Sequence, residues 1–153
     1  MPVTIAREPV RQKAVIALLQ QSDAYMATLY PAESNHLFDV ASLEKPEVSF
    51  FVARKDGEIV GCCALVVSGE GTAEIKRMFV SPEARGLAIG RLLMEALEDC
   101  ARATGLAAIR LETGISQPEA IGLYRRFGFV EIPPFGSYRP DPLSLFMEKR
   151  LAD

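Results

Sequence analysis

The chain has 153 residues, of which 49% are hydrophobic and 24% are charged, and its formal net charge is −3. This composition is typical of a globular protein and excludes a largely disordered chain, and the length leads us to expect a single domain over residues 1–153. The small negative charge argues against binding of nucleic acid or of an anionic membrane surface.

The N-terminal half predicts a strand, a helix and an antiparallel meander. Val3–Ala6 is a strand candidate, and apolar residues recur at helical spacing within Val10–Leu29. Pro31–Lys45 is expected to be a loop with a short helix. Two turn signals, Asp56-Gly57 and Ser68–Gly71, then separate three alternating stretches. The three predicted strands are Val48–Arg54, Glu58–Val67 and Thr72–Val80.

Helical periodicity returns in the C-terminal half. The apolar positions of Ile89–Ala101 form one stripe, and Gly105 follows where a helix would end. Ala107–Thr113 is typical of a buried strand, so the helix is a crossover between parallel strands. The remaining predicted elements are a helix at about Gln117–Phe127, strands at Phe129–Ile132 and Leu143–Lys149, and a proline-rich loop at Pro133–Pro142. These elements predict the α+β class, with a mixed sheet, a βαβ crossover and flanking helices.

The cysteines and the N-terminus bear on metals and on cellular compartment. The 3 cysteines, Cys62, Cys63 and Cys100, form neither a C-x-x-C motif nor a Cys/His cluster. We therefore expect no metal site and a reducing compartment. Met1–Met26 has no apolar core of the signal-peptide type, and no apolar run approaches the length of about 20 residues that spans a bilayer. A cytoplasmic protein that does not enter a membrane is expected.

The stretch Met78–Arg91 has the features of a phosphate site. A strand ends, a loop turns, and a helix begins among small residues that allow a ligand to approach the backbone. These small residues are Gly86, Ala88 and Gly90. The free N–H groups at the helix start attract an anion, and Arg85 and Arg91 add charged donors. The alternative is a tight turn that merely requires small residues; the P-loop and dinucleotide signatures are both missing from the sequence.

Two motifs resemble those of one enzyme family. Arg85–Gly90 is similar to the Q/R-x-x-G-x-G/A signature of the GNAT superfamily, the GCN5-related N-acetyltransferases. Ala120–Phe129 resembles the second GNAT motif, A-x-x-L-Y-x-x-x-G-F. The helix and strand between the motifs and the preceding meander also match. The resemblance covers about residues 3–149 and implies the GNAT-like acyl-CoA N-acyltransferase fold.

The resemblance implies acetyl-CoA as the cofactor. In GNAT enzymes the coenzyme A diphosphate lies on the first motif, pantetheine pairs with the preceding strand end, and the thioester is wedged between the strands Thr72–Val80 and Ala107–Thr113. Ala88 replaces a more usual glycine, and Gln117 stands where many members have a pantetheine-binding asparagine. The implied cofactor-binding residues are Met78, Phe79, Val80, Arg85, Gly86, Leu87, Ala88, Ile89, Gly90, Arg91, Gln117 and Tyr124.

Tyr124 is the expected general acid. In the family this tyrosine often faces the thiol sulfur. A phenol of pKa about 10 is also well matched to protonating a thiolate of pKa about 8.5. The alternative is an aromatic side chain that only packs under the sheet.

Glu74 is the expected base, acting on the amine directly or through a water, because several GNAT enzymes carry a catalytic glutamate on this strand. An ion pair of Glu74 with a lysine or arginine is an equal alternative, and Glu112 is the second candidate. Strict alternation would put a charge on each face of the strand. One predicted face carries Glu74, Lys76 and Met78. The opposite face carries Ile75, Arg77 and Phe79.

The family builds its acceptor pocket from the first helix, the loop after it and the loop before the last strand. The candidates here are Tyr25, Tyr30, Glu33, Ser34, Asn35, His36, Tyr138 and Arg139, with Glu112 on a neighbouring strand. Arg139 could bind a substrate carboxylate, or it could be an exposed loop charge. His36 could be a base or a ligand, although a solvated side chain is the favoured interpretation.

These features together predict an acetyl-CoA-dependent N-acetyltransferase. With no base in the sequence to activate a cysteine, direct attack of a primary amine on the thioester is expected. The acceptor is expected to be a small molecule or amino acid derivative, and a protein amino group is the alternative. A non-catalytic acyl-CoA sensor and a nucleotide-phosphate binder are competing hypotheses. The resemblance also leads us to expect a homodimer.

Overall fold

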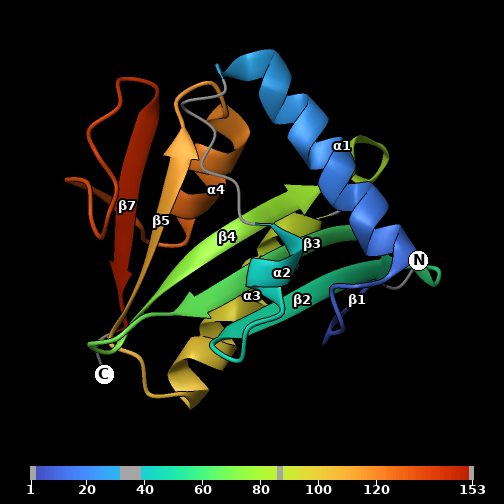
Figure 1. Ribbon diagram of the computed structural model, residues 1–153. Coiled ribbons are helices and arrows are strands. Elements are labelled where there is room, and N and C mark those ends of the chain that lie inside the picture. The colour runs from blue at the N-terminus through green and yellow to red at the C-terminus, as the bar shows by residue number, and fades with distance from the viewer. Residues whose placement is uncertain (1–2, 32–38, 86–87, 152–153) are drawn as a thin grey trace.

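The computed structural model describes residues 3–31, 39–85 and 88–151. These residues form a seven-stranded sheet in the order β1-β2-β3-β4-β5-β7-β6, with helices on both faces (Figure 1). The strands are β1 (Val3–Arg7), β2 (Val48–Lys55), β3 (Glu58–Val67), β4 (Thr72–Val80), β5 (Ala108–Gly114), β6 (Val130–Ile132) and β7 (Ser144–Arg150). The helices are α1 (Lys13–Leu29), α2 (Val40–Leu43), α3 (Ile89–Ala103) and α4 (Pro118–Arg126).

The predicted mixed sheet is confirmed. Strands β1 to β4 pair antiparallel, β4 and β5 pair parallel across the α3 crossover, and β5, β7 and β6 pair antiparallel. The largest difference in a boundary is at α1, which begins at Lys13 rather than near Val10, because Gln12 has an extended backbone with φ −126° and ψ 145°. The other predicted ends agree with the structure to within one residue. No helix of the described residues is long and apolar enough to cross a membrane.

Strands β4 and β5 separate along their length. They pair only from Thr72 to Ile75 on β4 and from Ala108 to Leu111 on β5. Beyond these pairs the two strands diverge, which Figure 1 shows as a V that opens from their common start. A gap therefore opens in the sheet where the thioester is expected.

A β-bulge lies in β4 next to this gap. Cys62 pairs with Phe79 and Ala64 with Lys76, so Cys63 alone faces both Arg77 and Met78. Arg77 takes the left-handed conformation at φ 59°. An extra residue of this kind bends a strand and re-aims the side chains that follow.

The bulge makes the predicted alternation of side chains along β4 wrong. Ile75 and the later Met78 both pack in the core under α3, whereas Phe79 packs in the separate core under α1. Arg77 reaches α1 as well, where its Nη1 donates to Asp23 Oδ1 at 2.5 Å. The charged side chains of β4 consequently share the α1 face instead of being divided between faces.

Candidate active site

A cavity of about 700 Å³ lies between the end of β4, the start of α3 and the helix α4. Its lining includes nine of the predicted cofactor residues: Met78, Phe79, Val80, Arg85, Ala88, Ile89, Gly90, Arg91 and Gln117. The predicted residues Gly86 and Leu87 lie outside the described residues. The lining also includes Tyr25 of α1 and a face of α4 that were not assigned to the cofactor. The α4 face comprises Pro118, Glu119, Ala120, Leu123 and Arg126, with Phe127 just beyond.

The start of α3 is open to an anion. Ala88 precedes the helix in the left-handed conformation at φ 61°, and no side chain caps the first N–H groups. A glycine takes this conformation without steric cost, which explains why glycine is the more usual residue here. The uncapped N–H groups and the positive end of the helix dipole suit a phosphate.

Arg85 is held beside this helix start by contacts from two other elements. Its Nε donates to the carbonyl oxygen of Val80 at 3.2 Å. Its guanidinium carbon lies 5.6 Å from the ring centroid of Tyr25 and 5.8 Å from that of Phe79. The guanidinium is therefore presented to the cavity with its planar face supported by aromatic rings.

Gln117 is oriented by two donors. Its Oε1 accepts from the backbone N–H of Gly114 at 3.2 Å and from the Tyr30 hydroxyl at 3.3 Å. The amide Nε2 has no partner among the described residues, and Gln117 belongs to the cavity lining. Gln117 thus offers an N–H donor, as a contact to a pantetheine carbonyl requires.

Tyr30, predicted for the acceptor pocket, lies instead in a buried junction between α1 and the turn that follows β5. It is 7% exposed, and its hydroxyl accepts from the backbone N–H of Ser116 at 3.1 Å. It lines neither this cavity nor the second one described below. Its described contacts position Gln117 and the turn before α4.

The Tyr30 junction yields a stability prediction. A Cβ at Gly114 would lie 1.8 Å from Tyr30 Oη and 2.1 Å from Tyr30 Cζ. We expect Gly114→Ala to lower the free energy of unfolding by about 1–3 kcal/mol through overpacking, measured by urea denaturation. The control is Gly69→Ala, whose added methyl meets nothing within 4 Å. Equal stability of the two variants would contradict the prediction.

Tyr124 lies on α4 in the core beside the bulge. It is 5% exposed, its ring packs on Phe129 with centroids 5.9 Å apart, and its hydroxyl has no hydrogen-bond partner among the described residues. Burial and the neighbouring Cys63 thiol raise the pKa of Tyr124 above its ordinary value. Packing on Phe129 explains the ring, and no described residue bonds the hydroxyl. Tyr124 is absent from the lining of the cavity beside α3, unlike the other described residues that were predicted to bind the cofactor.

The cysteines of β3 are unsuited to nucleophilic attack. Cys62 and Cys63 are fully buried, and burial raises the pKa of Cys62 to about 12 and that of Cys63 well above its ordinary value. Both thiols therefore stay protonated at neutral pH, which favours the expected direct attack.

A second cavity of about 950 Å³ lies over the α1 face of the sheet. We call it the front cavity. Of the predicted acceptor residues, Tyr138 and Arg139 line it, whereas Asn35 and His36 lie outside the described residues. Its lining comprises Ser68, Gly69, Glu70, Thr72, Ala73, Glu74, Lys76, Arg110, and residues 135–141 of the loop before β7.

Glu74 is part of a three-residue network at the edge of the front cavity. The Tyr138 hydroxyl donates to Glu74 Oε2 at 2.5 Å, and Lys76 Nζ donates to the same hydroxyl. Lys76 Nζ also lies 3.3 Å from Glu74 Oε2, so the predicted alternative of an ion pair is present. Oε1 of Glu74 has no partner among the described residues. The ion pair therefore uses one carboxylate oxygen and leaves the other available.

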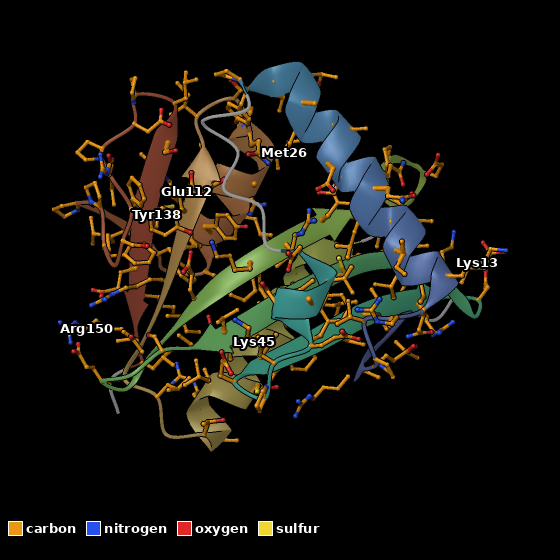
Figure 2. All side chains as sticks on the ribbon, in the orientation of Figure 1. Lys13, Met26, Lys45, Glu112, Tyr138 and Arg150 are labelled. Carbon is orange, nitrogen blue, oxygen red and sulfur yellow. The ribbon has the colours of Figure 1, made fainter. Side chains whose placement is uncertain are left out.

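Glu112 and Tyr138 lie close together in front of β5 and β7 (Figure 2), and the Glu112 charge contributes to the raised pKa of Tyr138. Burial is the largest cause of that rise, followed by Glu74. Glu112 Oε2 accepts from the Ser144 hydroxyl at 2.6 Å. Glu112 lies past the last β4–β5 pair and outside the lining of the front cavity. It is thus beside the gap rather than in the cavity.

Comparison with known proteins agrees with this architecture. The profile of the Acetyltransferase (GNAT) family matches residues 15–129. An Azospirillum brasilense protein named IAA acetyltransferase is 57% identical over 97% of this chain and 98% of its own length. A solved Klebsiella pneumoniae structure, described as an acyl-CoA N-acyltransferase, is 40% identical with a TM-score of 0.87 and 98% coverage of both chains.

The fold alone is shared with a more distant structure. The PaiA N-acetyltransferase of Thermoplasma acidophilum, solved in complex with coenzyme A, is 19% identical with a TM-score of 0.79, covering 98% of this chain and 99% of its own. The family match and the close relatives are sufficient for assignment: the chain belongs to the GNAT acetyltransferase family. It is an N-acetyltransferase that uses acetyl-CoA.

Proposed function

We propose that this enzyme acetylates the amino group of a small molecule that binds in the front cavity, with Tyr124 and Glu74 as catalytic residues. The observation that supports the proposal is the Tyr124 hydroxyl on α4, which has no hydrogen-bond partner among the described residues and lies near Cys63, opposite the bulge of β4. Acetyl-CoA supplies the activated acetyl thioester. The cavity beside α3 suits its diphosphate, and the gap suits its acyl end.

Tyr124 assists departure of the sulfur. Its O–H donates to the sulfur as the carbon–sulfur bond breaks, which disperses the negative charge that develops there. The raised pKa of Tyr124 keeps this hydroxyl protonated throughout the working pH range. The departing thiolate needs such a donor because the core around Tyr124 offers little solvent.

Glu74 removes the proton that the attacking nitrogen must lose. Oε2 is anchored by Tyr138 and Lys76, so Oε1 is the free acceptor, directly or through a water. One proton leaves the amine and one reaches the thiol, so the products are the amide and free coenzyme A. The anchoring fixes the carboxylate in the lining of the front cavity.

A small-molecule acceptor has two supports. The front cavity, at about 950 Å³, has the size of a small-molecule site. The Azospirillum relative, which aligns along nearly the whole chain, is named for acetylation of a compound abbreviated IAA rather than of a protein.

The pH dependence tests these roles. We expect kcat/KM for the acceptor amine to rise about tenfold per pH unit until the pKa of the acceptor, about 9–10 for a simple amine, because only the free amine attacks. Raised pKa values of Tyr124 and Tyr138 keep both hydroxyls protonated, so no descending limb is expected below about pH 10. Thiol release measured from pH 6 to pH 10 gives the profile. A fall in rate between pH 7 and pH 9 would contradict the assigned roles.

A further inference from the structure

The front cavity has opposite charges on the two strands beneath it. Glu74 of β4 and Arg110 of β5 are direct partners in the parallel register. Neighbouring strands are about 4.8 Å apart, and both side chains point away from the α3 core, so the two residues leave adjacent strands on the same face. They nevertheless do not bind one another. Glu74 is held by Tyr138 and Lys76, and Arg110 Nε donates to Glu148 of β7 at 2.9 Å.

Both side chains keep unused hydrogen-bonding groups at the cavity. Within the described chain, Arg110 has a polar partner only at Nε, which leaves the N–H groups of Nη1 and Nη2 as donors. Glu74 keeps Oε1 as an acceptor. Arg139, on the loop above, has no hydrogen bond or ion pair with any described residue. The cavity thus offers Glu74 Oε1 as an acceptor on β4, beside the Lys76 ammonium that pairs with Oε2, and the Nη donors of Arg110 on β5.

An aromatic wall adjoins the basic side. The ring of Phe135 lies 5.7 Å from Arg110 Cζ and packs edge-on against Tyr138 with centroids 5.2 Å apart. Two further carboxylates line the cavity, Glu70 and Asp141, but Asp141 Oδ1 accepts from the backbone N–H of Leu143 within its own loop. Lys76 also lines the cavity but is paired with Glu74. The Nη groups of Arg110 and the guanidinium of Arg139 are therefore the cationic donors that the described contacts leave for a ligand.

We propose that the acceptor is a small amino acid, whose amino group lies toward Glu74 and whose carboxylate is bound by Arg110 and Arg139. This inference rests on the proposed amine acetylation and adds the substrate class. An amino acid carries its amino and carboxylate groups on one carbon, so the amino group can approach Glu74 on one strand while the carboxylate approaches Arg110 on the neighbouring strand. A planar guanidinium suits a carboxylate, and an apolar or aromatic side chain fits the wall of Phe135 and Tyr138. An amine without a carboxylate would leave the Arg110 donors unpaired in the cavity.

Three acceptors that differ in one group test this proposal: phenylalanine, phenylalaninamide and 2-phenylethylamine. Their rates of thiol release from acetyl-CoA are compared at equal concentrations of free amine. We expect kcat/KM for phenylalanine to exceed that for the other two at least tenfold, the effect of a charge-assisted contact. Arg110→Gln should reduce this preference to less than about threefold, and Arg110→Lys should restore part of it.

The control is Arg102→Gln, which removes an equal charge from the exposed end of α3, where Arg102 contacts Glu98 at 3.9 Å. It should retain the preference, and both variants should bind acetyl-CoA as the parent does. Equal use of all three acceptors by the parent would overturn the amino acid class but leave amine acetylation standing. Acetylation of none would overturn the proposed function and this inference together. If Arg110→Gln does not fold, the preference of the parent enzyme among the three acceptors is sufficient to support or overturn the amino acid class.

Discussion

Replacement of Tyr124 by phenylalanine is expected to lower kcat by about 100-fold or more, the usual contribution of a positioned acid. The ring would keep its contact with Phe129, so only the hydroxyl is lost. Because no described residue bonds this hydroxyl, its removal breaks no described hydrogen bond of the fold. The effect should therefore appear in turnover, with the affinity for acetyl-CoA nearly unchanged.

Three measurements separate this catalytic role from packing: kcat by thiol release, the dissociation constant of acetyl-CoA by calorimetry, and the melting temperature. A structural tyrosine would change the melting temperature and leave kcat within a fewfold of the parent. A Tyr124→Phe enzyme that turns over like the parent would refute the assignment of the acid.

Glu74→Gln is the second large effect that we expect, a loss of about 100-fold in kcat/KM for the amine at neutral pH. Glutamine preserves the size of the side chain and can still accept from the Tyr138 hydroxyl, but it cannot take a proton. The deficit should shrink as the pH rises toward the pKa of the acceptor and hydroxide assumes the role of the base. A merely structural ion pair with Lys76 would give a stability change with no such pH-dependent recovery.

The matched control for Glu74→Gln is Glu131→Gln, the same change on the exposed edge strand β6. This control should retain the parent's activity. If Glu74→Gln and Glu131→Gln have the same pH–rate profile, Glu74 is not the base.

Local signals predicted residues that the structure brings together around one cavity. Residues 85–91 form one contiguous turn and helix start, and their chemistry depends on small residues and backbone N–H groups that a sequence displays directly. The spacing of hydrophobic residues also predicted the order of the helices and strands, since each of them buries one face. Tyr25 was predicted for the acceptor pocket, yet it lines the cavity beside α3, because its position depends on how α1 packs beside Arg85.

Long-range pairing determined what the sequence could not predict. Glu74 and Arg110 become neighbours only through the register of β4 and β5, and the lining of the front cavity by Arg110 had no local signal. The bulge at Arg77 was hidden because an arginine rarely adopts positive φ. Tyr30 was expected near the acceptor from its place after α1, yet its hydroxyl meets the turn after β5, far along the chain.

Calorimetric titration with acetyl-CoA, with NAD and ATP titrated in parallel, tests the cofactor cavity most directly. We predict one site of micromolar affinity for acetyl-CoA alone, and about tenfold weaker binding by Arg85→Ala, which removes a charged donor from the cavity. Heat of binding only with ATP or NAD, or an Arg85→Ala protein that binds acetyl-CoA as tightly as the parent, would contradict the placement of coenzyme A between β4, α3 and α4.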